Sequence, residues 1–291
     1  MIASCDGPNG GKLFKYLGSD RVDVLANRLI RFTPPDALND PFELRLNFSA
    51  LASPQEREEV VEQRLRPALL DAFAKMGIRA EEIPPPILYS IEGELRKRLP
   101  DQIAAFEASV KDPIAAALRN SLGEQIGILS LTEDPVNSVM WSHYASRCGG
   151  YVLGFDSRHP WFCQQKSETD EFRHVRKVRY QDEPPNGVMT RTTAEDVFLT
   201  KGTGWEYERE WRIVRPLREA TKVIQPHNEA IHLFEFPASA LASVVLGSRA
   251  SKDLTESIRE RLQEPEFRHV ARFTAEGISG KYEYHLVPAD H

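Results

Sequence analysis

Residues 205–213 read Trp-Glu-Tyr-Glu-Arg-Glu-Trp-Arg-Ile and form the most informative stretch of the chain. Bulky apolar residues alternate here with charged ones, as they do along a β-strand with one buried face. We therefore expect a strand over residues 205–214 with two unlike faces. One face carries Trp205, Tyr207, Trp211 and Ile213, and the other carries Glu206, Glu208, Glu210 and Arg212. Neighbouring carboxylates on one face repel one another unless a partner neutralises them, so the pattern indicates either a solvated face balanced by Arg212 or a ligand site.

Further strands are predicted on both sides of this stretch by short apolar segments bounded by Gly, Pro, Asn or Asp. They cover residues 13–16, 29–32, 126–131, 151–155, 175–180, 231–236, 242–246 and 282–287. Helical spacing is predicted over residues 20–28, 134–148 and 251–263. Because strands and helices do not alternate regularly, we expect an α+β fold with a mixed or antiparallel sheet rather than a βαβ series.

Residues 53–122 differ in character because helical periodicity dominates them. Ser53-Pro54-Gln55-Glu56 has the form of a capping box with proline at the first helical position. After an interruption at Pro84-Pro85-Pro86 we expect three shorter helices, over residues 88–98, 101–109 and 113–122. The sequence is thus expected to form a single α+β domain over residues 1–291, with residues 53–122 as a helical insertion.

Composition limits the class of protein. Of the 291 residues, 41% are hydrophobic and 27% are charged, which is typical of a globular protein with a sizeable core. The net charge of −6 argues against a broadly basic nucleic-acid-binding surface. The polar N-terminus does not resemble a secretory signal, and no apolar run approaches the roughly 18 residues of a membrane span. We therefore expect a cytoplasmic protein without a membrane partner.

The segment Met140-Trp-Ser-His-Tyr-Ala145 lies on the helix predicted over residues 134–148. Trp141, Tyr144 and Cys148 recur at helical spacing, which in most helices marks a stripe facing the core. His143 lies off that stripe. The eight histidines and three cysteines show neither HExxH nor CxxC spacing, so no zinc site is expected.

Asn39-Asp40-Pro41-Phe42-Glu43 is typical of a turn, because Asn and Asp side chains accept hydrogen bonds from nearby backbone donors and proline fixes φ. As an alternative, the segment could contribute metal ligands. Asp40 and Glu43 could join Glu208 and Glu210 in a divalent-metal site of the kind used by nucleases and phosphoesterases.

Several of these segments together resemble a widespread bacterial family of domains of unknown function. They are Leu13-Phe-Lys-Tyr16, Asn39-Asp-Pro-Phe-Glu43, Met140-Trp-Ser-His-Tyr-Ala145, Trp205-Glu-Tyr-Glu-Arg-Glu-Trp-Arg212 and Val244-Val-Leu-Gly247. The Trp-x-Tyr-Glu-x-Glu-Trp-Arg element is the most specific of them, and the helical insertion lies outside the resemblance. That family in turn resembles the ADP-ribosyltransferase fold, a split β-sheet core that binds NAD in a cleft.

The resemblance implies roles for particular residues. Glu208-Arg209-Glu210 resembles the Glu-x-Glu element of arginine-type transferases, with Glu210 as the catalytic glutamate and Glu208 facing the acceptor. Ser130-Leu131-Thr132 resembles their Ser-Thr-Ser element without its central Thr. Lys15 and Tyr16 occupy the first-strand position where such enzymes carry Arg or His. The remaining implied residues are Trp141, His143 and Tyr144 near NAD, and Asn39, Asp40 and Arg212 on the substrate side or in a structural role.

The function implied by the resemblance is an NAD-dependent ADP-ribosyltransferase or NAD glycohydrolase. NAD would then be a substrate, and the acceptor would be a protein or a nucleic acid. Such a protein could serve as a bacterial toxin or anti-phage effector, with an antitoxin or regulatory partner. Two alternatives stay open. The first is a metal-dependent nuclease or phosphoesterase. The second is a non-catalytic module that binds a nucleotide or nucleic acid.

Overall fold

The structure is a computed structural model that describes residues 7–8, 10–44, 46–226 and 229–289. The chain divides into two compact units. The first, here called the sheet unit, comprises Met1–Leu44, Ser121–Pro184 and Phe198–His291. The second, called the helical unit, comprises Arg45–Asn120 and Pro185–Val197. None of the helices in the described ranges has the length and apolar character needed to cross a membrane.

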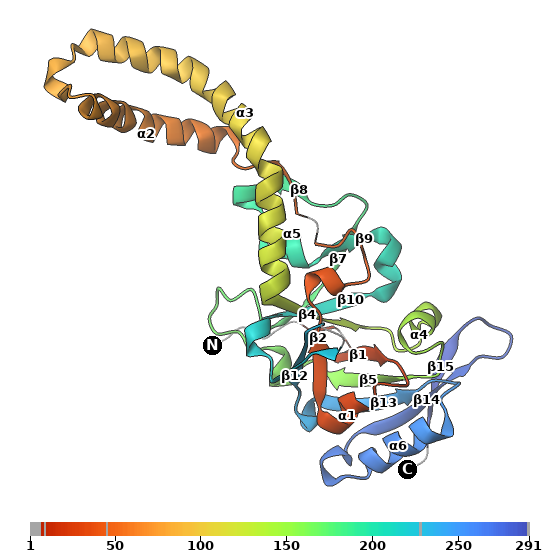
Figure 1. The fold of residues 1–291 in the computed structure, drawn as a ribbon. Coiled ribbons are helices and arrows are strands. Elements are labelled where there is room, and N and C mark those ends of the chain that lie inside the picture. Colours follow the sequence, from red (N-terminus) through yellow and green to blue (C-terminus); the bar gives the residue numbers. More distant parts are fainter. Residues whose placement is uncertain (1–6, 9, 45, 227–228, 290–291) are drawn as a thin grey trace. The chain divides into compact units, whose positions relative to one another are not determined.

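The sheet unit is built on an eight-stranded sheet with the order β15-β14-β13-β5-β1-β4-β10-β6 (Figure 1). Its strands are β1 (Lys12–Leu17), β4 (Ile126–Thr132), β5 (Tyr151–Asp156), β6 (Val175–Lys177), β10 (Glu210–Pro216), β13 (Leu241–Leu246), β14 (Ala271–Gly277) and β15 (Tyr284–Pro288). The β13–β14 pair is parallel and every other neighbouring pair is antiparallel. The expectation of an α+β protein with a mixed, mostly antiparallel sheet is therefore confirmed.

The centre of this sheet is buried on both faces. Along β5, Tyr151 and Leu153 belong to one hydrophobic cluster and Val152 to another. The first cluster is covered by α1 (Asp23–Asn27) and α6 (Lys252–Leu262), and the second by α4 (Ser138–Tyr144). Two-sided burial explains why this strand reads as a continuous apolar run rather than as an alternating one.

Smaller sheets complete the two units. In the sheet unit, β11 (Lys222–Ile224), β12 (Ile231–Glu235) and β2 (Leu29–Phe32) form one, and β7 (Arg179–Gln181) pairs with β9 (Thr200–Gly202) in another. In the helical unit, β3 (Asn47–Ala50) pairs with β8 (Asn186–Val188). A short helix, α5 (Ala194–Phe198), follows at the end of the helical unit's second segment.

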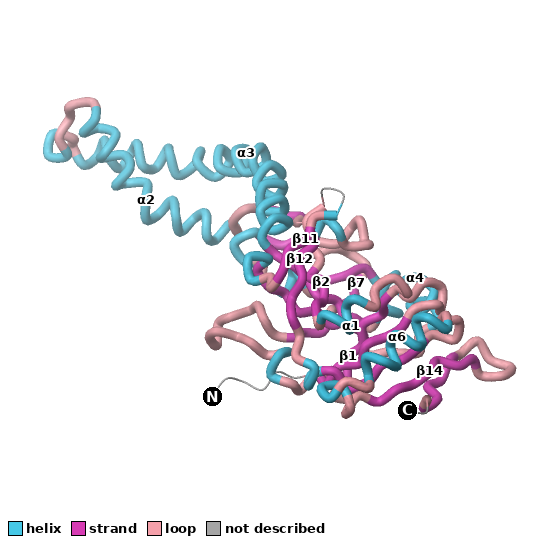
Figure 2. The backbone as a smooth tube through the Cα atoms, turned by 60° about the horizontal axis from the view of Figure 1, so that its bottom comes forward, coloured by secondary structure: helices cyan, strands magenta, loops and turns pink. Residues whose placement is uncertain are grey.

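The helical unit contains α2 (Pro54–Lys75) and most of α3 (Pro85–Gln125), which run side by side (Figure 2). The predicted capping box is confirmed, because the Ser53 hydroxyl accepts from the Glu56 N–H at 3.2 Å and a Glu56 carboxylate oxygen accepts from the Ser53 N–H at 2.6 Å. Ion pairs join the two helices, among them Arg57 with Glu107 at 2.7 Å.

The expectation of three separate helices after the proline run was wrong, because α3 is continuous through Pro100 and Pro113. A proline inside a helix removes one backbone hydrogen bond and costs about 3 kcal/mol. Contacts with α2 hold the helix together on both sides of Pro100, through Glu92 with Arg66 and Glu107 with Arg57.

The prediction of a strand over residues 205–214 was wrong for residues 205–209. Residues Thr203–Glu208 form 3-10 turns, Arg209 adopts a left-handed conformation with φ of 43°, and β10 begins at Glu210. The strand expected over residues 175–180 is divided between β6 and β7, and β14 was not predicted. Local turn geometry thus overrides the alternation of residue types before Glu210.

Gly150 permits a close backbone approach at the start of β5, because a Cβ atom there would lie 2.1 Å from the carbonyl oxygen of Leu17. We expect Gly150→Ala to reduce the free energy of unfolding by about 3 kcal/mol, the cost of forcing an atom into a packed site. Gly277→Ala is the matched control, since nothing lies within 4 Å of its added Cβ. Urea unfolding of the three proteins measures the effect, and equal stabilities of the two variants would contradict it.

Candidate functional site

Strands β1 and β4 are neighbours in the sheet but diverge after a single pair of residues, and this divergence is called the split. These strands are paired at Phe14 and Thr132, whereas further along β4 the backbone of Ile128 pairs with Thr33 instead. Between these two points the Ser130 carbonyl accepts a hydrogen bond from the Lys15 ammonium at 3.0 Å. The side chain of Lys15 therefore supplies the donor that a neighbouring strand would otherwise provide.

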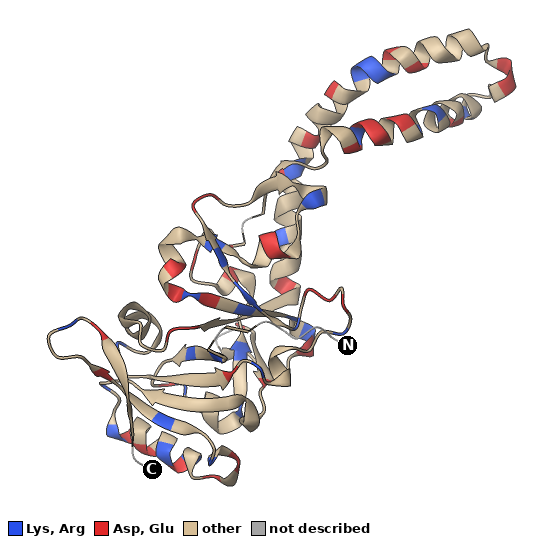
Figure 3. Ribbon diagram, turned by 180° about the vertical axis from the view of Figure 1, so that it is seen from behind, with Lys and Arg blue, Asp and Glu red and all other residues tan. Residues whose placement is uncertain are grey.

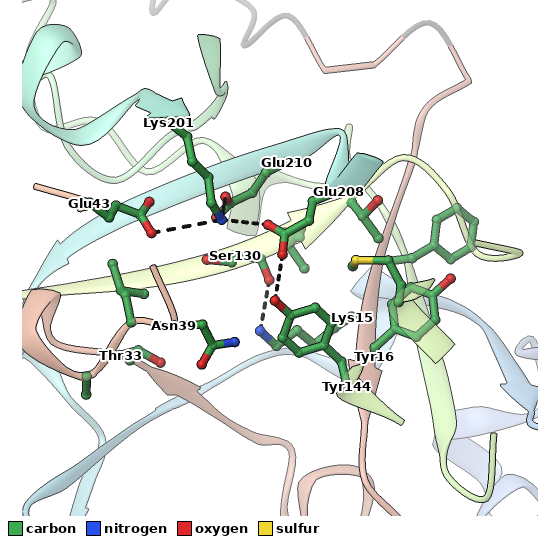
Figure 4. A pocket seen from close by; sticks show the side chains of 16 residues that line it. Lys15, Tyr16, Thr33, Asn39, Glu43, Ser130, Tyr144, Lys201, Glu208 and Glu210 are labelled. Carbon is green, nitrogen blue, oxygen red and sulfur yellow. Dashed lines mark hydrogen bonds and ion pairs between the residues drawn. The ribbon is translucent and has the colours of Figure 1, made fainter. Parts of the chain in front are cut away.

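A cavity of about 170 Å³ lies at this split (Figure 4). Three consecutive residues of β1, Phe14 to Tyr16, and three of β4, Ser130 to Thr132, line it. The remaining polar lining comes from Thr33, Asn39, Glu43, Tyr144, Lys201, Glu208 and Glu210. All of these residues belong to the sheet unit.

Glu208 and Glu210 reach the same cavity although they belong to different elements. Glu208 ends the 3-10 turn and Glu210 opens β10, with Arg209 between them. The left-handed conformation of Arg209 reverses the chain at this point and leaves its own side chain exposed, while both glutamates are buried. The prediction that the two carboxylates lie on the same side is confirmed. The reason is the turn at Arg209, however, and not the alternation of a strand.

Lys201, on β9, lies between the carboxylates. Its ammonium donates to Glu208 at 2.6 Å and to Glu210 at 2.9 Å, and lies 3.9 Å from Glu43. The Trp205 ring lies 5.0 Å from the same nitrogen, a cation–π distance. Sequence reasoning missed Lys201, since a three-residue strand gives little periodic signal and the residue is remote from every motif.

Arg212 holds the carboxylate of Glu210 in position. It is two residues further along β10 and therefore on the same face. Its guanidinium bonds both oxygens of Glu210, at 2.8 and 2.9 Å, and donates to the Phe198 carbonyl at 2.7 Å. It also forms an ion pair with Glu43. Since Arg212 is 1% exposed and does not line the cavity, its position is structural.

The charges at the site are balanced. Glu43, Glu208 and Glu210 face the cations of Lys15, Lys201 and Arg212. Such pairing is required because an isolated buried charge is costly.

Burial shifts the proton affinities of these groups. It raises the pKa of Glu210, which the charge of Lys201 partly opposes. For Lys201, burial lowers the pKa, but the charges of Glu210 and Glu208 outweigh it and the net pKa is raised. For Lys15, burial dominates and lowers the pKa to about 8. Lys201 is thus a permanent cation near neutral pH, whereas Lys15 loses its proton just above it.

Tyr144 is positioned by helix α4. Its hydroxyl donates to Glu208 at 2.6 Å, and burial followed by this bond raises its pKa. The Asn137 side chain caps α4 by accepting from the N–H of Val139 at 2.9 Å, and donates to the Tyr207 carbonyl at 3.0 Å. One side chain therefore joins the start of α4 to the turn that carries Glu208.

Among the remaining predicted site residues, Lys15, Tyr16, Asn39, Ser130 and Thr132 line the cavity. The hydroxyl of Tyr16 donates to the Asp134 carbonyl at 2.8 Å.

Besides Arg212, three predicted residues lie outside the cavity lining. Trp141 is 0% exposed, donates to the Pro135 carbonyl and packs edge-on against Tyr16, so it cannot stack on a ligand. His143 is exposed on α4. Asp40 accepts from the Phe42 N–H at 2.8 Å, which is the role expected for a turn residue.

The carboxylates proposed as metal ligands are occupied by internal cations. Glu43, Glu208 and Glu210 are bonded to Lys201 or Arg212, and the Asp40 carboxylate accepts from its own loop. Among the described residues there is no group of three or more His, Cys, Asp or Glu side chains suited to a metal ion. A divalent ion here would have to displace both cations.

Comparison with known proteins finds a family model that is similar to part of the chain. Residues 140–213 match the model of a family described as "Protein of unknown function (DUF2971)". The match covers the elements from α4 to β10 that carry Tyr144, Lys201, Glu208, Glu210 and Arg212, and excludes Lys15, Asn39 and Glu43. No curated protein and no solved structure matches the chain.

We expect Lys201→Met to destabilise the protein by about 3–5 kcal/mol, because it leaves buried carboxylates without their partner. The exposed cation of Lys166, 2.9 Å from Glu219, serves as the control, and Lys166→Met should cost about 0–1 kcal/mol.

The loss should also depend on pH. Without Lys201 the already raised pKa of Glu210 rises further, so the folded variant holds a proton that the unfolded chain releases. Its stability is then greatest in acid and falls as pH rises through the folded pKa. Urea unfolding at pH 5 and pH 8 tests this, and an equal loss at both values would refute the role of Lys201.

Proposed function

We propose that the chain is an NAD-consuming enzyme of the ADP-ribosyltransferase kind, which breaks the bond between nicotinamide and ribose. One observation carries the proposal. The three segments that resemble transferase motifs lie on, or lead directly into, three adjacent strands, β1, β4 and β10, and each segment contributes residues to the lining of one cavity. Glu210 pairs with Thr132 in the strand register, and Phe14, next to Lys15, also pairs with Thr132. The split between β1 and β4 supports the proposed likeness to a split-sheet core.

The size and charge of the cavity suit part of a dinucleotide. Its volume of about 170 Å³ is below the roughly 300–1,000 Å³ of sites that enclose a drug-sized ligand. It would therefore hold one ring or sugar of NAD while the remainder lies outside. The lining has three carboxylates against the two ammonium groups of Lys15 and Lys201, which favours a hydroxyl-bearing group such as ribose over a bare phosphate. Carboxylate oxygens accept hydrogen bonds from sugar hydroxyls.

The proposed reaction uses the two glutamates differently. When the ribose–nicotinamide bond breaks, its electron pair leaves with nicotinamide and positive charge develops on the ribose. The Glu210 carboxylate, held in place by Arg212 and Lys201, stabilises that charge. Water or an acceptor nucleophile then bonds to the ribose carbon and passes its proton to Glu208 as general base.

Tyr16 and Tyr144 offer aromatic rings to the nicotinamide at the cavity wall. In this proposal the acceptor is a protein or nucleic acid for a transferase and water for a glycohydrolase. A role as toxin or anti-phage effector, controlled by an antitoxin or regulatory partner, extends the same proposal.

One observation favours a second candidate, in which the cavity binds a nucleotide without turnover. Both oxygens of Glu210 are already bonded to Arg212, and one also to Lys201, which leaves this carboxylate fewer free positions for a ligand. Such a module would bind NAD or a related nucleotide saturably and release no nicotinamide.

We expect purified protein to release nicotinamide from NAD, and Glu210→Gln to lower the rate by a factor of about 10²–10³, the usual effect of losing one electrostatic stabiliser. Glu206→Gln is the matched control, because Glu206 is exposed and does not line the cavity. The assay measures nicotinamide with and without cell lysate as acceptor. Release stimulated by lysate indicates transfer, and release independent of it indicates hydrolysis.

Activity unchanged in Glu210→Gln would remove this residue from the mechanism. NAD binding without release, detected by calorimetry, would favour the binding module, and neither binding nor release would refute the proposal.

A further inference from the structure

A second hollow, of about 250 Å³, lies in the sheet unit where α6 ends beside β14. Arg259, Leu262, Gln263, Arg268, Val270 and Arg272 line it. Among these described residues three are arginines and none is acidic. The hollow shares no lining residue with the cavity at Glu210.

Arg272 reaches this hollow because of its place on β14. The neighbouring residues Phe273 and Ala275 belong to the hydrophobic cluster under α4, so Arg272 points to the opposite face of the sheet. That face is covered by Leu254 and Ile258 of α6. Apolar side chains are the usual choice on a helix-covered strand face, and an arginine there requires another explanation.

Two of the three arginines have no acidic partner among the described residues. Arg259 forms an ion pair with Glu256, but within the described part of the chain no ion pair or hydrogen bond engages the guanidinium of Arg268 or Arg272. The Nε of Arg272 is buried without a hydrogen-bond partner. Like charges converge here in a protein whose net charge is −6. Figure 3 shows both Lys/Arg and Asp/Glu bands on α6, the helix near the C-terminus, so the excess of positive charge is confined to the hollow itself.

The end of helix α6 explains only part of this arrangement. Arginines in a last helical turn interact favourably with the negative end of the helix dipole, which accounts for Arg259. It does not account for Arg268, which follows the helix, or for Arg272, which comes from a strand.

We propose that this hollow binds the phosphate group of a small phosphorylated molecule. The planar guanidinium fork matches phosphate oxygens in pairs, and several arginines together form the usual phosphate site. The Gln263 amide offers a further donor, and Leu262 and Val270 offer apolar contact to the carbon part of the ligand. The site is independent of the NAD chemistry proposed for the cavity at Glu210.

The test is calorimetric titration of the full chain at low salt with ribose 5-phosphate, ribose and inorganic phosphate. We expect saturable binding of phosphate, and binding of ribose 5-phosphate that is tighter than that of ribose. Arg268→Gln and Arg272→Gln should each weaken binding at least tenfold. Arg261→Gln is the control, because Arg261 pairs with Glu264 at 2.7 Å and does not line the hollow. Glu210→Gln should also leave binding unchanged.

Absence of binding by the unchanged protein, or full binding by both arginine variants, would overturn the proposal. If Arg272→Gln does not fold, the test relies on Arg268→Gln, because Arg268 is exposed and its replacement leaves the core intact. A single-stranded oligonucleotide that binds more tightly than ribose 5-phosphate, with a salt dependence corresponding to several phosphates, would instead identify a nucleic-acid surface and also overturn the proposal.

Discussion

The ammonium of Lys201 is the constraint on which the site depends. Two carboxylates, Glu208 and Glu210, are buried together by the turn before β10, and their mutual repulsion would destabilise this arrangement without a cation between them. The cation comes from β9, the carboxylates from the turn and from β10, and Tyr144 from α4. The ammonium therefore joins three elements, and the Tyr144–Glu208 hydrogen bond adds α4 as a fourth.

This arrangement gives the cavity a fixed pattern of donors and acceptors before any ligand arrives. Arg212 and Lys201 orient Glu210, Tyr144 orients Glu208, and Lys15 is held by a backbone carbonyl at the split between two strands. A site whose dipoles are already aligned loses little free energy to reorganisation when charge develops in it. The same rigidity would serve selective binding, which is why nicotinamide release separates the two candidate functions.

Sequence reasoning identified the sheet and much of the cavity lining, for reasons that differ from residue to residue. The apolar runs at β1, β4 and β5 predicted strands because burial on both faces leaves few polar residues in them. The alternation at residues 205–213 found the two glutamates but misjudged their backbone, since a single left-handed residue, Arg209, cannot be read from residue type. Lys201 was beyond prediction because its role depends on the pairing of β9 with β7. Trp141 was expected near NAD from the resemblance, although its helical spacing is equally that of the core-facing residue it proves to be.

The position of β1 has a consequence for how the molecule is made. This strand is synthesised before the other strands of its sheet, yet it lies between β4 and β5, with the Lys15–Ser130 contact spanning 115 positions of the chain. Its partners are synthesised only after the whole of α2 and α3. Contacts between distant parts of a chain slow folding, because loop closure must precede the stabilisation that it brings. The nascent N-terminal strand therefore waits unpaired while the helical hairpin forms. At this stage its exposed edges offer the chain its main opportunity to aggregate, and a chaperone its main point of engagement.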